Sequence, residues 1–117
     1  MTQYTELTTL DDWQRLLVRS NERPTLLFKH STTCPISARA YREFQSYLGG
    51  TPETHTDYAL VKVIESRPVS NQVAQDLHVY HESPQVILIQ NQVAVWSTSH
   101  GRITQRSLQD ALSQAHG

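Results

Sequence analysis

Short apolar runs alternate along this chain with segments whose apolar residues recur at helical spacing. This alternation constrains the fold most, because strands joined through helices are typical of a layered α/β sheet. The apolar runs, read as strands, cover residues 5–7, 25–29, 58–64, 85–89 and 93–97. Connections through helices predict parallel neighbours, and the tight turn at Asn91-Gln92 predicts an antiparallel strand at the edge.

The intervening and final segments predict helices. Their apolar stripes are Leu10, Trp13, Leu16 and Leu17; Ile36, Ala40, Phe44 and Leu48; Val69, Val73 and Leu77; and Leu108, Ala111, Leu112 and Ala115. Thr9 and Asp12 resemble a capping box, Pro68 opens the third helix, and Thr104 is a plausible cap for the last. The order β-α-β-α-β-α-β-β-α is that of the thioredoxin fold, a central mixed four- to five-stranded sheet flanked by helices. The length of 117 residues predicts one such α/β domain over residues 1–117.

Charge and cysteine content exclude several classes of protein. The formal charge is −1, with 10 basic and 11 acidic residues and no basic cluster, which disfavours a nucleic-acid partner. No apolar stretch approaches the ~20 residues of a membrane span. The N-terminal sequence has neither a basic start nor an apolar core, so no secretory signal is expected. A single cysteine cannot form an internal disulfide, and we therefore expect a cytoplasmic protein.

The segment FKHSTTCPIS, residues 28–37, contains that cysteine, Cys34. Pro35 is favoured in the first position of a helix, which makes Cys34 the expected N-cap. Unpaired N–H groups and the helix dipole then favour a thiolate, the nucleophilic form. Lys29 and His30, at the end of the preceding strand, are candidates to add positive charge. A buried structural cysteine is the alternative, but the polar STTCP setting favours a reactive thiol.

Ser83 and Pro84 stand directly before the strand at residues 85–89, a position where a sheet tolerates proline. In thioredoxin-like proteins the strand after the third helix begins with a cis proline beside the active cysteine. Its neighbouring backbone pairs with a bound disulfide substrate. The resemblance therefore implies a cis Ser83–Pro84 bond and a substrate-binding role for both residues. An ordinary trans proline is the alternative.

FKHSTTCPIS, together with SPQVILIQNQ further on, resembles the monothiol bacilliredoxin family; the diagnostic TCPIS motif runs from Thr33 to Ser37. The family uses bacillithiol, a cysteine–glucosamine–malate thiol that forms mixed disulfides with protein cysteines under oxidative stress. The resemblance implies that Cys34 attacks the bacillithiol sulfur, frees the protein thiol and retains bacillithiol. A second bacillithiol, or another reductant, would then restore Cys34. Bacillithiolated proteins would be the partners and bacillithiol the co-substrate, with no tightly bound cofactor or metal.

Ser37 occupies the place where a two-cysteine redox motif carries its second thiol. It is expected to cap the helix, to donate a hydrogen bond to the sulfur, or to be inert. Thr33, Pro35, Ser37 and His30 are the predicted supporting residues around Cys34. One alternative function is a glutaredoxin-like iron–sulfur carrier, which Pro35 disfavours because such carriers typically have glycine after the cysteine. Another is a catalytically silent thioredoxin-like binding module.

Other polar candidates have weaker support. Arg39 and Arg42 flank the predicted active helix; they either meet the malate carboxylates of bacillithiol or form a solvated face, which the sequence favours. His78 and His81 are spaced to share a helix face, but two histidines make a poor metal site, so surface positions are expected.

Overall fold

The computed structural model describes residues 3–116, so Met1, Thr2 and Gly117 of the predicted domain lie outside the described residues. The predicted element order is confirmed. The elements are β1 (Thr5–Leu7), α1 (Leu10–Arg19), β2 (Thr25–His30), α2 (Pro35–Gly49), β3 (Asp57–Lys62), α3 (Arg67–Leu77), β4 (Gln85–Gln90), β5 (Val93–Ser99), the 3₁₀ turn η1 (His100–Arg102) and α4 (Gln105–His116). Within residues 3–116 no helix has the length and apolarity needed to cross a membrane.

The five strands form one mixed sheet, as expected, and the structure gives their order as β1-β3-β2-β4-β5. β3 runs parallel to β1 and β2, whereas β4 runs antiparallel to both β2 and β5. The prediction that helical connections give parallel strands is therefore wrong for β4. His30 pairs with Lys62, and Lys29 pairs with Gln85. β2 and β3 therefore end, and β4 begins, along one edge of the sheet, where edge means the side formed by strand ends and not an outer strand. α3 and the loop after it carry the chain past β2 and return it to the edge where β3 finished, so β4 starts there and runs antiparallel.

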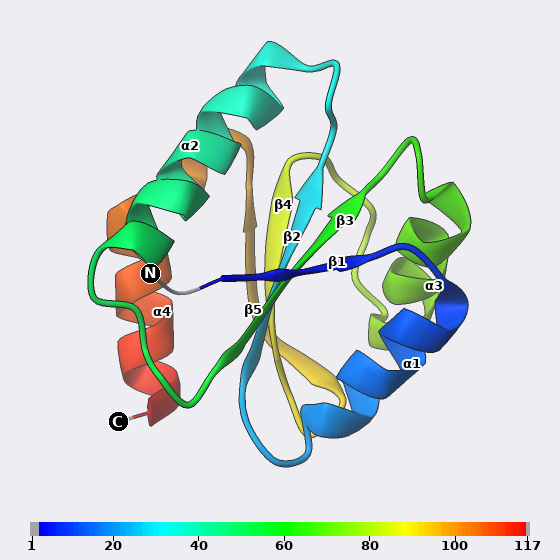
Figure 1. The fold of residues 1–117 in the computed structure, drawn as a ribbon, viewed down its shortest axis with the longest axis horizontal. Helices are drawn as coiled ribbons and strands as arrows, with labels where there is room; N and C mark the ends of the chain where they lie inside the picture. Colours follow the sequence, from blue (N-terminus) through cyan, green and yellow to red (C-terminus); the bar gives the residue numbers. More distant parts are fainter. Residues whose placement is uncertain (1–2, 117) are drawn as a thin grey trace.

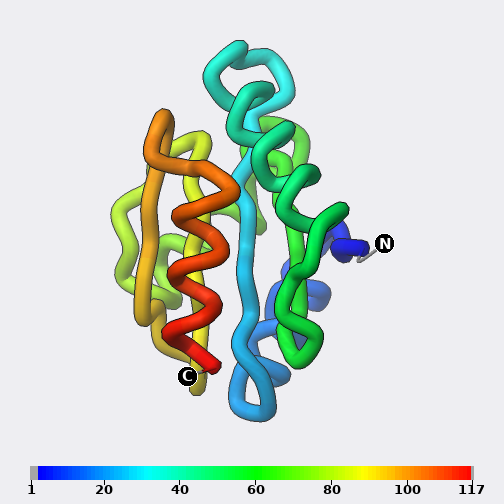
Figure 2. Tube along the Cα trace, turned by 90° about the vertical axis from the view of Figure 1, so that its left-hand side faces the viewer, coloured from blue at the N-terminus to red at the C-terminus, as the bar shows by residue number. Residues whose placement is uncertain are grey.

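Helices cover both faces of the sheet (Figures 1 and 2). α2 and α4 pack on one face, where Phe44 and Leu108 join a cluster with Phe28 of β2. α1 and α3 pack on the other, where Trp13 and Val73 join a cluster with Leu27 and its neighbours. Successive side chains of a strand point to opposite faces. This alternation decides the direction of the residues that lead to Cys34.

Local sequence signals explain how several of these elements begin and turn. Thr9 Oγ1 accepts a hydrogen bond from the Asp12 N–H at 3.0 Å, and the Asp12 carboxylate accepts one from the Thr9 N–H at 3.2 Å. The predicted capping box is thus confirmed. Thr104 Oγ1 accepts from the Ser107 N–H at 3.0 Å, which confirms Thr104 as the cap of α4. The β4–β5 turn places Asn91 and Gln92 at φ 53° and 63°, the left-handed region that tight hairpin turns use.

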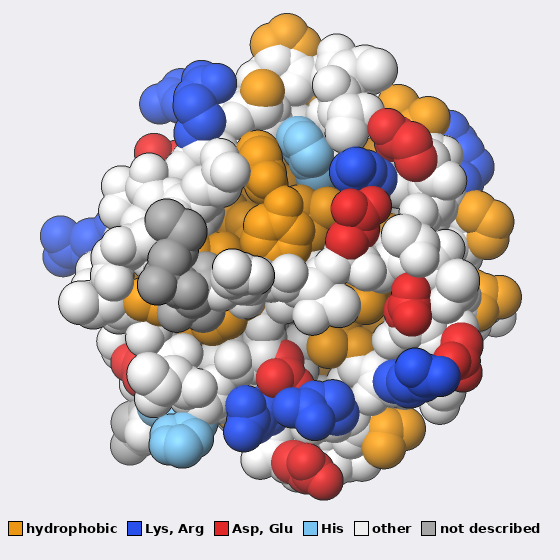
Figure 3. Space-filling model, in the orientation of Figure 1, with side chains coloured by type: hydrophobic (Ala, Val, Ile, Leu, Met, Phe, Trp, Pro, Cys, Tyr) orange, Lys and Arg blue, Asp and Glu red, His pale blue; other side chains and the backbone are white. Residues whose placement is uncertain are grey.

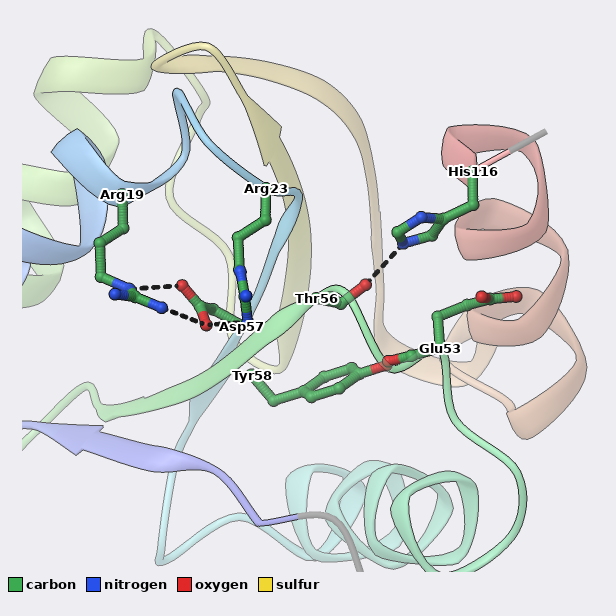
Figure 4. A network of polar contacts seen from close by, with 7 residues as sticks. All are labelled: Arg19, Arg23, Glu53, Thr56, Asp57, Tyr58 and His116. Carbon is green, nitrogen blue, oxygen red and sulfur yellow. Dashed lines mark hydrogen bonds and ion pairs between the residues drawn. The ribbon is translucent and has the colours of Figure 1, made fainter.

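Polar contacts secure the opposite edge of the sheet, where β3 begins (Figure 4). The Asp57 carboxylate accepts a hydrogen bond from Arg19 Nε at 2.8 Å and pairs with Arg23 Nη1 at 3.5 Å. Thr56 Oγ1 and His116 Nε2 lie 2.7 Å apart and join the residue directly before β3 to the end of α4. These contacts attach α1 and α4 to the sheet, at the edge opposite to the one from which the chain proceeds to Cys34.

Candidate active site

Cys34 is the N-cap of α2, with extended backbone angles of φ −105° and ψ 123°, and Pro35 lies in the first turn. This confirms the placement predicted from the sequence. The Cys34 carbonyl accepts a hydrogen bond from the Ala38 N–H at 3.0 Å, whereas the thiol makes no cap hydrogen bond. The residue is half-buried. The sulfur therefore sits at a helix N-terminus without being sealed in the core.

Ser37 anchors the first turn of α2 to the end of β2. Its side chain is fully buried, and its hydroxyl oxygen accepts a hydrogen bond from the Ser31 N–H at 2.9 Å. The same oxygen lies 2.8 Å from His30 Nδ1. The sequence predicts that Ser37 caps the helix, donates to the sulfur or is inert; instead its partners, Ser31 and His30, make it an anchor for the loop before α2. In the first turn of α2, the side chain that faces the protein interior is thus the hydroxyl of Ser37.

His30 points to the α2 face of the sheet and is enclosed by aromatic rings. Its ring stacks on Tyr41 at a centroid distance of 4.8 Å and meets Phe28 edge-on at 5.7 Å. Burial lowers the pKa of His30, and the charges of Glu65 and Lys62 have smaller, opposing effects. At neutral pH the imidazole is therefore uncharged. His30 thus does not supply the positive charge considered in the sequence analysis. It contributes a contact with the Ser37 hydroxyl instead.

Lys29, one residue earlier, points to the opposite face of the sheet. Its side chain is fully buried, and its Nζ lies 3.0 Å from His81 Nδ1. Burial lowers the pKa of Lys29 to about 8. Its charge is directed towards the α1 and α3 side instead of the α2 N-terminus. The side chains of Lys29 and His30 thus point to opposite faces of the sheet. Neither supplies the positive charge near Cys34 for which both were candidates.

His78 and His81 are both exposed, as the sequence predicts, and they do not share a helix face. His78 is the left-handed C-cap of α3 at φ 55°, and His81 lies in the following loop beside Lys29. Across residues 3–116, no three His, Cys, Asp or Glu side chains gather as a metal site would require. The position of His81 shows that α3 ends before it.

The loop between β2 and α2 is fixed from a second side. Thr32 Oγ1 donates a hydrogen bond to Glu65 Oε2 at 2.7 Å, which joins this loop to the one after β3. That hydrogen bond is the main cause of the lowered pKa of Glu65. Thr33 and Pro35, two predicted supporting residues, flank Cys34 and are exposed. Ser37 and His30, the other two predicted supporting residues, are buried and contact each other.

The Ser83–Pro84 bond is cis, as predicted. Pro84 is buried, and the Pro84 carbonyl accepts a hydrogen bond from the His100 N–H at 3.1 Å. The buried Ser83 hydroxyl has no hydrogen-bond partner among the described residues. Because Gln85 pairs with Lys29, this dipeptide lies at the sheet edge from which the chain proceeds to Cys34. The fold thus brings the two predicted parts of the site to one edge.

A groove of about 510 Å³ extends from Pro35 and Ile36, directly after Cys34, between α2 and the segment before α4. Its lining residues are Pro35, Ile36, Arg39, Ala40, Arg42, Glu43, His100, Gly101, Ile103 and Thr104. The wall formed by residues 100–104 could not be predicted from the sequence, because no local motif marks it. The only signal was the spacing of Arg39 and Arg42, which places both on one side of α2.

A half-buried cysteine at the first turn after β2, with a cis proline at the same sheet edge, defines a thioredoxin-fold thiol protein. Comparison with solved structures agrees. One protein with a thioredoxin fold, described as a candidate oxidoreductase, is 33% identical with a TM-score of 0.78, covering 97% of this chain and 94% of its own. Thioredoxin from Fasciola hepatica matches at 15% identity and a TM-score of 0.72, covering 95% of this chain and 98% of its own. That match shows the fold alone.

The family model for monothiol bacilliredoxin BrxC matches residues 5–108. The chain belongs to the monothiol bacilliredoxin family, a group of thioredoxin-like thiol oxidoreductases. The family resemblance inferred from TCPIS is therefore confirmed.

Proposed function

We propose that this protein removes bacillithiol from protein mixed disulfides by transferring it to Cys34. The observation that carries the proposal is a lone, half-buried cysteine at the N-cap of α2, in a chain of the monothiol bacilliredoxin family. The target proteins are bacillithiolated partners in the cytoplasm under oxidative stress. Bacillithiol acts as co-substrate, and no tightly bound cofactor is required.

The exchange has two balanced steps. The Cys34 thiolate attacks the bacillithiol sulfur of the mixed disulfide, a Cys34–bacillithiol disulfide forms, and the target leaves as a thiolate that takes a proton from water. A second bacillithiol thiolate, or another thiol reductant, then attacks that disulfide. When bacillithiol does so, the products are bacillithiol disulfide and the Cys34 thiolate. Each step exchanges one sulfur–sulfur bond for another through a mixed disulfide.

The surrounding residues are assigned supporting roles in this exchange. Ser37 and His30 hold the first turn of α2 in place, and Thr33 and Pro35 leave the sulfur open to an incoming disulfide. Ser83, whose backbone neighbours the cis proline, would pair with the bound substrate, and Pro84 would hold that segment in place, as in thioredoxin-like proteins. Their position at the same sheet edge supports that role.

Substitution of the nucleophile tests the proposal. Cys34→Ser should lose all transfer from a bacillithiolated target, because a serine hydroxyl is hardly ionised at neutral pH. Its melting temperature should match that of the parent, since the thiol makes no cap hydrogen bond. Release of the target thiol and thermal unfolding are the two measurements. Full release by Cys34→Ser would refute covalent transfer, because the chain contains no other cysteine.

A further inference from the structure

The groove beside Cys34 has the size and position of a small-molecule site. Its volume of about 510 Å³ lies within the ~300–1,000 Å³ of typical ligand pockets. Pro35 and Ile36 form the end nearest the sulfur, and Arg39 and Arg42 lie further along the same helix. At a rise of ~1.5 Å per residue, Arg39 and Arg42 lie about 8 and 12 Å along α2 from Cys34.

The charge of the groove is positive. Arg39 and Arg42 are exposed, and neither forms an ion pair or side-chain hydrogen bond with another described residue. The single acidic side chain of the lining, Glu43, accepts a hydrogen bond through Oε1 from the Gln105 N–H at 3.1 Å. Figure 3 shows positive side chains over the N-terminal part of α2, at the upper left. Two guanidinium groups therefore remain for an anionic ligand.

The N-terminus of α4, at the far wall, is not the source of anion affinity. The Thr104 side chain and the Ser107 side chain each accept the other residue's backbone N–H, both at 3.0 Å. The Gln105 N–H is taken by Glu43. Because these donors are occupied within the protein, the arginines are the groups that can bind a carboxylate, for which the planar guanidinium is well suited.

We propose that this groove binds the carboxylate-bearing end of a small-molecule thiol whose sulfur is joined to Cys34. This inference rests on the proposed function, in which that thiol is bacillithiol and the carboxylates are those of its malate. Arg39 and Arg42 are then specificity residues for the small thiol and do not take part in the sulfur exchange. The span along α2 from Cys34 to the arginines suits a conjugate of three units better than cysteine alone.

Two small disulfides test this assignment. The reduced full chain is mixed with bacillithiol disulfide or with neutral 2-hydroxyethyl disulfide, and the rate of mass gain at Cys34 is measured. The double variant Arg39→Gln/Arg42→Gln should react about tenfold more slowly with bacillithiol disulfide, because two partly exposed charge-assisted contacts are lost. Its rate with the neutral disulfide should stay within about twofold of the parent.

The matched control is Arg15→Gln/Arg106→Gln, which removes two exposed arginines that do not line the groove. Both of its rates should match those of the parent. Equal slowing of the double groove variant with both disulfides would overturn the inference, since the arginines would then act on the thiolate. Unchanged rates would overturn it as well. A parent protein that gains no bacillithiol would refute the proposed function, and the assignment with it.

Discussion

Lys29 is a buried charge without a carboxylate partner among the described residues. Its Nζ contacts only the imidazole of His81, and burial lowers its pKa from 10.5 to about 8. The ammonium therefore destabilises the folded chain at neutral pH. A pKa lowered from 10.5 to about 8 corresponds to about 3 kcal/mol of folding free energy. A buried charge of this kind is a cost to stability that an apolar side chain of similar shape would relieve.

Replacement by methionine should therefore stabilise the protein. We expect Lys29→Met to raise the free energy of unfolding at pH 7 by about 1–3 kcal/mol, measured by urea denaturation. The same substitution at the half-exposed Lys62 is the control, and should have little effect. A Lys29→Met variant less stable than the parent at pH 7 would show that the contact with His81 outweighs the cost of burial.

The pH dependence of this gain has a defined sign. Between about pH 8 and 10.5 the unfolded chain holds a proton on Lys29 that the folded chain has released. The contribution of Lys29 to stability therefore rises with pH across that window. The advantage of Lys29→Met should shrink from pH 8 to 10.5. A constant difference between the two proteins over that range would contradict the lowered pKa.

At the scale of elements, the junction of β2 with α2 was the most predictable part of the site. The apolar run, Pro35 and the single thiol were enough to place Cys34 at the N-cap. The directions of Lys29 and His30 also follow from strand alternation, because Leu27 and Phe28 already point to opposite faces. The partners of Ser37 were not predictable, since its contacts depend on how the loop folds back.

The antiparallel direction of β4 could not be read from element order alone. A helix between two strands is compatible with a return to either edge of the sheet. Here α3 ends at Leu77, and residues 78–84 bring the chain back to the edge where β3 ended. The groove was missed for the same reason. Its walls come from α2 and residues 100–104, which only the tertiary fold brings together.

A second thiol in the first turn of α2 tests the geometry of this element. Ser37→Cys places a thiol at the buried position one turn from Cys34 and creates a Cys-x-x-Cys pair. The new thiol should attack the Cys34–bacillithiol disulfide, because a tethered thiol has a far higher effective concentration than a free one. Intact mass should then show an internal disulfide in place of the bacillithiol adduct. Ser46→Cys, at an exposed position later in α2, is the control and should keep the adduct.

A mixed disulfide as long-lived in Ser37→Cys as in the parent would mean that position 37 does not approach the sulfur.

At the scale of the whole molecule, the contacts that stabilise the fold lie apart from the residues around Cys34. Two apolar clusters cover the faces of the sheet, and polar contacts around Asp57 hold one edge. Cys34 and the cis Ser83–Pro84 bond belong to the other edge. The groove extends from the same region between α2 and η1. In our proposal, this arrangement would expose the Cys34 sulfur to a protein mixed disulfide whose bacillithiol half lies in the groove.

The most direct test of the central claim is the intact mass of the reduced protein after brief mixing with a bacillithiolated target. Transfer to Cys34 predicts that this chain gains the mass of one bacillithiol less two hydrogens, while the target loses the same mass. Cys34→Ser should gain nothing. A target released without any adduct on the parent chain, or a chain left unmodified beside an intact mixed disulfide, would contradict the account.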